Sequence, residues 1–163
     1  MGAARVAQSI FSLILLAAFG TIVHAQPIPP IDAEETPLHW AAGHGLTGVA
    51  SRLIENGADL DAVDEFGRNA LHYAVAFPDV VSLLIDGGID VNAADIFGRT
   101  PLHAALQYPD TVSLLISAGA DISATDYMGD TPLERTLRYG TRQRNLAVIN
   151  MLLDAGAGAS NRR

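Results

Sequence analysis

Apolar residues fall into short runs separated by polar turns, and this arrangement repeats along the chain. A Thr-Pro-Leu-His-Trp-Ala-Ala run begins at residue 36, and related runs begin at residues 69, 100 and 131. Each is followed by a second apolar run that ends at a glycine; these glycines are Gly57, Gly88, Gly119 and Gly156. A period of 31 to 33 residues predicts a stacked repeat array and not a single globular core.

The residue types within each period predict two short helices followed by a turn. Thr36, Thr100 and Thr131 can each cap a helix whose first residue is proline. The glycine after each second run suits a left-handed helix end. An Asp-x-x-Gly turn then leads to the next unit, and its glycines suit a positive φ; they are Gly67, Gly98 and Gly129. One helix pair cannot bury its own apolar face, but stacked neighbours can.

These motifs resemble the ankyrin repeat. In that family Thr-Pro-Leu-His opens the first helix, Leu-Leu-x-x-Gly-Ala-Asp closes the second, and Asp-x-x-Gly forms a β-hairpin tip. The resemblance covers about residues 36–157 and implies an all-α repeat solenoid of about four units, at 36–68, 69–99, 100–130 and 131–157. It also implies a non-enzymatic, monomeric protein–protein interaction module that binds another protein and needs no cofactor.

Three histidines, His39, His72 and His103, recur at one position of successive units. Successive repeats stand too far apart for these imidazoles to share one metal ion. The resemblance implies that each histidine bonds to backbone of the adjacent turn, so we interpret all three as structural. The sequence shows no nucleophile elbow, His-Glu-x-x-His motif or phosphate loop. We therefore predict no catalytic, cofactor or metal site.

The first 35 residues differ from the repeats. Arg5 precedes an apolar stretch of about 14 residues, and Val23-His24-Ala25 suits signal-peptide cleavage. The stretch is shorter than the roughly 20 residues that span a bilayer. We predict a signal peptide at 1–25, cleaved after Ala25, with an uncleaved membrane anchor as the alternative. A proline-rich spacer at 26–35 and a flexible tail at 158–163 complete the predicted organisation.

Charge is distributed unevenly along the chain. Between residues 26 and 130 there are sixteen acidic residues and three arginines, a net charge of −13. From residue 131 onward six arginines face two acidic residues, a net charge of +4. An acidic solenoid repels nucleic acid and anionic lipid, so we expect neither nucleic acid nor, after leader cleavage, a membrane as partner.

The leader and the repeats together predict an exported binding module, periplasmic or secreted. The chain resembles exported bacterial ankyrin proteins that support periplasmic enzymes such as catalase, which makes support of a periplasmic enzyme or stress response one hypothesis. The alternative is a secreted effector or toxin-system component that acts on a target outside the cell.

Ankyrin proteins usually meet partners through hairpin tips and inner helices. Phe66, Phe97 and Met128 occupy the same place in successive units, which predicts an apolar row for binding. The alternative is that these side chains pack on neighbouring tips. The tip candidates are Glu65, Phe66, Arg68, Ile96, Phe97, Arg99, Tyr127, Met128 and Asp130. The inner-helix candidates are Tyr73, Phe77, Gln107 and Tyr108.

The fourth unit departs from the pattern of the others. Glu134 replaces the histidine, and the turn from Tyr139 onward is about four residues longer. We expect its cations to be uncompensated and exposed, and to dock an acidic patch on the partner; they are Arg135, Arg138, Arg142 and Arg144. The alternative is a solvated terminal cap. Arg52 indicates a cap in the first unit too, because its counterparts are Leu83 and Leu114.

Overall fold

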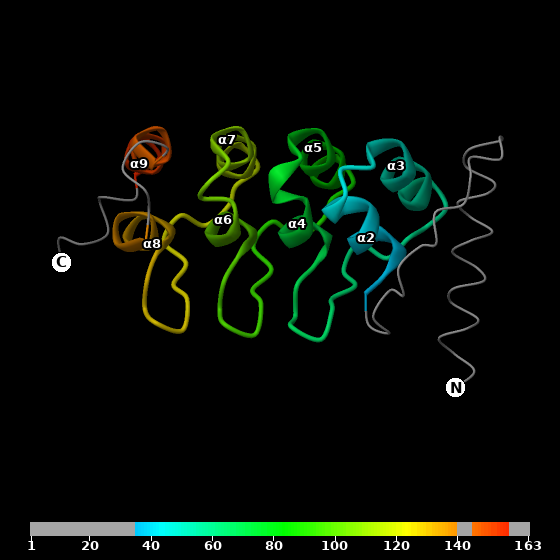
Figure 1. Cartoon of the computed structure of the whole chain (residues 1–163), viewed down its shortest axis with the longest axis horizontal. Coiled ribbons are helices and arrows are strands. Elements are labelled where there is room, and N and C mark those ends of the chain that lie inside the picture. Colours follow the sequence, from blue (N-terminus) through cyan, green and yellow to red (C-terminus); the bar gives the residue numbers. More distant parts are fainter. Residues whose placement is uncertain (1–34, 140–144, 157–163) are drawn as a thin grey trace.

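The computed structural model describes residues 35–139 and 145–156, which form four stacked helix pairs (Figure 1). The predicted signal peptide, residues 26–34 of the spacer, Arg142, Arg144 and the tail lie outside the described residues. The pairs are α2 (Pro37–Gly43) with α3 (Thr47–Glu55), α4 (Ala70–Tyr73) with α5 (Pro78–Asp86), α6 (Pro101–Ala104) with α7 (Pro109–Ser117), and α8 (Pro132–Tyr139) with α9 (Asn145–Asp154). The predicted all-α repeat solenoid is confirmed.

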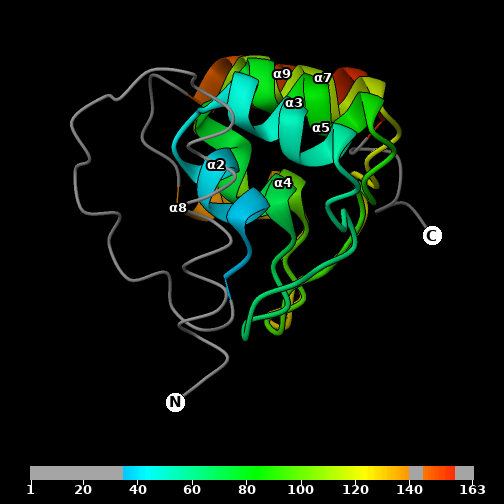
Figure 2. The same ribbon diagram turned by 90° about the vertical axis from the view of Figure 1, so that its right-hand side faces the viewer.

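The helices form two layers. Helices α3, α5, α7 and α9 pack in one row, and α2, α4, α6 and α8 lie in a second row beside it (Figures 1 and 2). The segments that join one pair to the next project beyond the second row as hairpin-like turns (Figure 2). No strand is present in residues 35–139 or 145–156. The tips predicted as β-hairpins are therefore hydrogen-bonded turns.

The first helix of each unit begins with a reciprocal cap. Thr36 and Thr100 each accept a bond from the third helical residue, a histidine, whose ring bonds back to the cap. Asn69 and His72 form the same pair at α4. At α8 the Oε2 atom of Glu134 accepts the Thr131 backbone N–H at 2.9 Å. Glu134 thus fills the capping role of the histidine, because a carboxylate at this position bonds the same backbone donor.

The core lies between the two layers and runs through all four units. Leu38, Leu71 and Leu102 of the second row are at most 2 % exposed, and leucines of the row formed by α3, α5, α7 and α9 complete the same core. Small alanines separate these leucines, so the helices approach closely; they are Ala41, Ala42, Ala70, Ala74 and Ala105. Because each unit contributes only a few large side chains, burial depends on the neighbouring unit, as in other solenoids.

The segments between paired helices differ from unit to unit. In the second unit a 3₁₀ turn, η1 (Ala74–Ala76), leads directly into α5, which begins at Pro78. Pro109 begins α7 in the same way. In the fourth unit α8 has 8 residues, against 4 in α4 and in α6. Only Tyr139 of the segment that we predicted as a longer turn lies in this helix, and residues 140–144 lie outside the described residues.

Candidate protein-interaction surface

Each tip is organised by a buried aspartate. The Oδ1 atom of Asp64 accepts the backbone N–H groups of Phe66 at 2.9 Å and Arg68 at 2.8 Å. Asp95 and Asp126 make the same pair of bonds in the next two tips. The glycine of each tip has a positive φ between 73° and 78°, which a side-chain-bearing residue would adopt only with strain. The tips are therefore preformed.

Neighbouring tips are joined by backbone hydrogen bonds. The N–H of Ile96 donates to the carbonyl of Phe66 at 2.8 Å, and the N–H of Tyr127 donates to the carbonyl of Phe97 at 2.9 Å. These bonds fix the spacing between one tip and the next. The tips at residues 64–68, 95–99 and 126–130 thus form one continuous edge of the molecule.

Arginine holds the carboxylate in the first two tips. The Arg68 guanidinium lies 2.6 Å from Oδ2 of Asp64, and the Tyr73 hydroxyl donates to the same oxygen at 2.7 Å. Burial by itself would raise the pKa of Asp64, but bonds from the backbone and side chain of Arg68 and from Tyr73 outweigh it and lower that pKa to about 2. Arg99 pairs with Asp95 at 2.7 Å.

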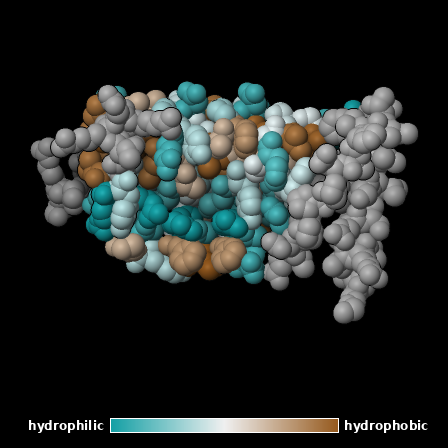
Figure 3. Space-filling view, viewed as in Figure 1, coloured by the Kyte–Doolittle hydropathy of each residue, from teal (hydrophilic) through white to brown (hydrophobic). Residues whose placement is uncertain are grey.

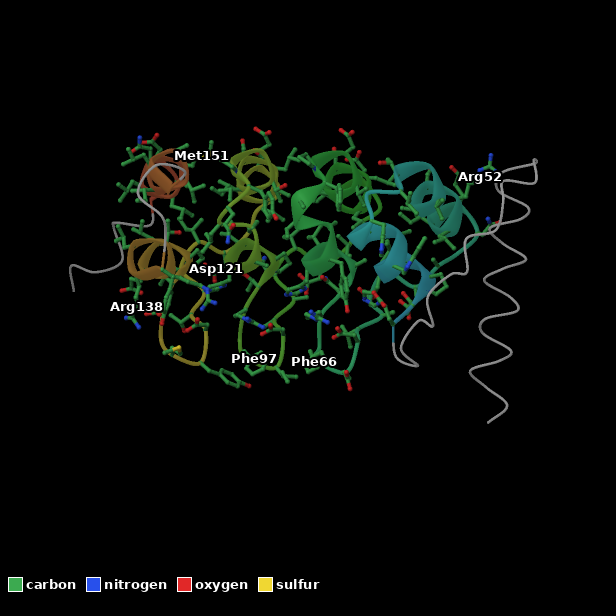
Figure 4. All side chains as sticks on the ribbon, viewed as in Figure 1. Arg52, Phe66, Phe97, Asp121, Arg138 and Met151 are labelled. Atoms are coloured by element: carbon green, nitrogen blue, oxygen red, sulfur yellow. The ribbon has the colours of Figure 1, made fainter. Side chains whose placement is uncertain are left out.

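The tip row is the set of exposed apolar side chains along this edge: Phe66, Ile96, Phe97, Tyr127 and Met128. Phe66 is 40 % exposed and Phe97 47 % exposed, although both are aromatic. The Arg68 guanidinium lies 5.1 Å from the Phe66 ring centre, and that of Arg99 lies 4.7 Å from the ring of Phe97. Both rings project from the lower edge in Figure 4, where Figure 3 shows an apolar band.

The third tip obtains its cation from elsewhere. Asp130 stands where the first two tips have arginine, and the buried Asp126 is instead paired with Arg135 of α8 at 2.9 Å. Arg138 in turn lies 2.7 Å from Asp130. The expectation that Arg135 and Arg138 are uncompensated is therefore wrong, because each is bonded to a buried aspartate that the sequence separates from it by eight or nine residues.

The repeated geometry agrees with comparison to known families. The family model for ankyrin repeats matches residues 2–95 and 77–162. The chain belongs to the ankyrin-repeat family. Members of this family act as protein–protein interaction modules, so the repeats indicate a protein partner.

Relatives match the ankyrin repeats only locally. An ankyrin repeat protein of Rickettsia bellii is 51 % identical over 41 residues, which cover 25 % of this chain and 17 % of the relative. Ankyrin repeat domain-containing protein 37 of Bos taurus is 41 % identical over 63 residues, covering 39 % and 38 %. A neurogenic locus notch homolog protein 1 of Xenopus tropicalis is 49 % identical over 45 residues, covering 28 % and 2 %. The chain thus spans well under half the length of these relatives.

Two of the three ankyrin histidines bond to the backbone of the tip that follows them. The Nε2 atom of His72 lies 3.0 Å from the carbonyl of Arg99, and that of His103 lies 3.2 Å from the carbonyl of Asp130. Burial lowers the pKa of all three histidines, which favours the neutral ring. His39 shares the cap, but its Nε2 atom makes no hydrogen bond of regular geometry. His72 and His103 thus have the structural bond that the resemblance implies.

Two of the inner-helix candidates are bonded or packed within the fold, and the other two are exposed. Tyr73 is bonded to both Asp64 and Arg68. Phe77 packs closely on the preceding turn. A Cβ atom added at Gly45 would lie only 2.5 Å from the Phe77 ring, so only glycine fits there. Gln107 and Tyr108 are exposed, as is Glu65 at the first tip. Tyr73 and Phe77 therefore serve the fold, and only the other three offer free surface.

The described residues contain no cluster of three or more histidine or carboxylate side chains arranged to hold a metal ion. Within the same part of the chain, no helix is long and apolar enough to cross a membrane. The role of Asp95 and Asp126 as tip organisers was not predicted from the sequence. Their recurrence at the place of Asp64, each followed four residues later by a polar side chain, was the available signal.

Proposed function

We propose that this ankyrin module is a non-enzymatic binding protein that captures its partner with the tip row, assisted by the exposed Glu65, Gln107 and Tyr108. The observation that carries the proposal is the exposure of large apolar side chains on a rigid edge. Contiguous exposed apolar surface is uncommon on soluble proteins and marks interaction sites. Aromatic residues with few rotatable bonds are also frequent energetic anchors of interfaces.

The tip row is preorganised for binding. Each phenylalanine backbone is fixed by a buried carboxylate, and each ring is covered on one side by an arginine that the same carboxylate holds. Little conformational entropy is then lost when a partner contacts these rings, and this lowers the cost of association. The partner that fits this edge has an apolar strip flanked by basic residues, because the surrounding repeats are strongly acidic.

We further propose that this module acts in the periplasm after export. The apolar segment before residue 24 and the small residue at position 25 support this proposal, because their layout is that of a signal peptide. Intact-mass measurement on protein from the periplasmic fraction should show loss of residues 1–25. A full-length product retained in the membrane would contradict export as a cleaved protein.

A capture experiment tests the binding proposal. The tagged protein is crosslinked in the organism that expresses it, and recovered proteins are identified and quantified by mass spectrometry. The amount of the specific partner recovered with the double variant Phe66→Ala with Phe97→Ala should be at least about tenfold lower than with the wild-type protein, since two anchoring rings are removed.

The matched control is Leu137→Gln with Leu153→Gln, which alters two exposed apolar residues at one end of the stack. This control should keep the partner. Equal recovery with the phenylalanine variant and the wild-type protein would exclude the tip row as the binding surface.

A further inference from the structure

One end of the stack keeps aliphatic side chains at positions that are covered in earlier repeats. Leu137 of α8 lies 31 residues after Leu106 and occupies the same repeat position. Leu106 is 9 % exposed, whereas Leu137 is 63 % exposed. Leu153 of α9 is 47 % exposed, whereas its counterparts pack against the core; they are Ile54, Ile85 and Ile116. This end therefore resembles an interior face without its neighbour.

Helix α9 strengthens this interpretation because it is apolar on opposite sides. Val148 and Leu152 are fully buried, while Leu146 and Leu153 are exposed. Leu146 and Leu153 are seven residues apart, so they share one side of the helix. Apolar surface gathers over α8 and α9 in Figure 3.

The opposite end of the stack is polar. Arg52 of α3 occupies the position that holds Leu83 and Leu114 in the next two units, and it is exposed together with Glu55 and His44. Figure 4 places Arg52 and Arg138 at opposite ends of the molecule. The first unit thus presents polar side chains at its end of the described stack, whereas the fourth unit presents Leu137, Leu146 and Leu153 at the other end.

The charge distribution also singles out the α8–α9 end. The two helices carry Glu134 and Asp154 against Arg135 and Arg138, so their charges balance. The net charge of −13 between residues 26 and 130 repels a second copy along most of the stack. Like-charge repulsion between the described residues of two copies is therefore smallest where the apolar surface is largest.

We propose that two copies of this chain associate through the end face formed by Leu137, Leu146 and Leu153. Residues 140–144 and 157–163 contain no leucine, isoleucine, valine, methionine or aromatic residue. A two-fold contact needs a self-complementary surface, and an apolar patch meets that need. A head-to-tail contact would instead place the patch on the polar face around Arg52. A dimer of this kind would differ from the monomer that the resemblance implies.

Sedimentation velocity on the purified full chain, from low micromolar to several hundred micromolar concentration, tests the proposal. The mass should rise from one copy to two, and the dimer should strengthen with salt. Salt screens the four arginines in residues 140–144 and 157–163, which repel their counterparts. Leu137→Gln with Leu153→Gln should weaken the dimer at least about tenfold by removing buried apolar area.

The control variant, Phe66→Ala with Phe97→Ala, should dimerise like the wild-type protein. All samples must have the same N-terminus by intact mass, so that the leader cannot account for a difference. Circular dichroism checks that the leucine variant is folded, and Leu146→Gln alone provides a second, milder test. A single-copy mass at every concentration, or unchanged dimerisation of both leucine variants, would overturn the proposal.

Discussion

The first and third tips pair a buried aspartate with arginines that come from different places in the sequence. Both bury an aspartate, Asp64 and Asp126, that accepts two backbone N–H groups of its turn. In the first tip the cation is Arg68, four residues later, whereas in the third it is Arg135, which belongs to the following helix. Each of these turns therefore has a cation at its carboxylate, and that cation comes from different places in the sequence.

The largest expected effect comes from removing the carboxylate. Asp64→Ala and Asp126→Ala should each lower the free energy of unfolding by about 2–4 kcal/mol, because two backbone donors lose their acceptor and a cation loses its partner. Urea unfolding followed by circular dichroism measures this loss. Asp61→Ala, at an exposed acid of the same unit, is the control and should change stability by no more than about 0.5 kcal/mol. A large loss in only one of the two tips would show that they are not equivalent.

The next effect compares the caps of the second and fourth units. His72→Ala should cost roughly 1–3 kcal/mol, since the ring bonds both the Asn69 cap and the carbonyl of Arg99 in the tip that follows. Glu134→Ala should cost less, because Glu134 is exposed and bonds only its own cap. Thermal and urea unfolding of both variants provide the measurement. Equal losses would mean that the bond from His72 to the carbonyl of Arg99 adds little to stability.

The same histidines predict a pH dependence. Burial lowers the pKa of His72 below its ordinary value of 6.5, so the folded state binds fewer protons than the unfolded state. Stability should be full above that pH and fall as the pH drops below it. Asp64, with its pKa lowered from 3.8 to about 2, should cause a second loss across that interval. The free energy of unfolding, measured with urea at several pH values between 7.5 and 5, should fall less steeply with decreasing pH for His72→Ala than for the wild-type protein.

A rescue experiment tests whether the position of the cation is interchangeable. Arg135→Gln should cost about 1–3 kcal/mol by leaving the charge of Asp126 buried without its partner. Adding Asp130→Arg places an arginine where Arg68 and Arg99 stand, and the double variant should regain at least half of that loss. Urea unfolding of the single and double variants measures this recovery. A double variant no more stable than Arg135→Gln alone would show that the backbone of the third tip does not accept the arrangement of the first.

Local signals in the sequence were sufficient for the repeat, the helix starts and the tip glycines. Thr36, Thr100 and their prolines act within a few residues of chain, so their effects do not depend on distant contacts. The pairing of Arg135 with Asp126 and the packing of Phe77 on Gly45 depend on how units stack, which residue spacing does not specify. Glu134 was interpreted as a departure, although a carboxylate can complete the same cap.

The smallest expected change in stability is at the tip row. Phe66→Ala with Phe97→Ala should alter the free energy of unfolding by no more than about 1 kcal/mol, because both residues are more than one-third exposed. Their backbone N–H groups still donate to Asp64 and Asp95 after the side chains are removed. The arginines lose a ring contact but keep their aspartates. Urea unfolding beside His72→Ala places both variants on one scale. If the phenylalanine pair proves as destabilising as the histidine change, these rings hold neighbouring tips together, and the row is packing and not a binding surface.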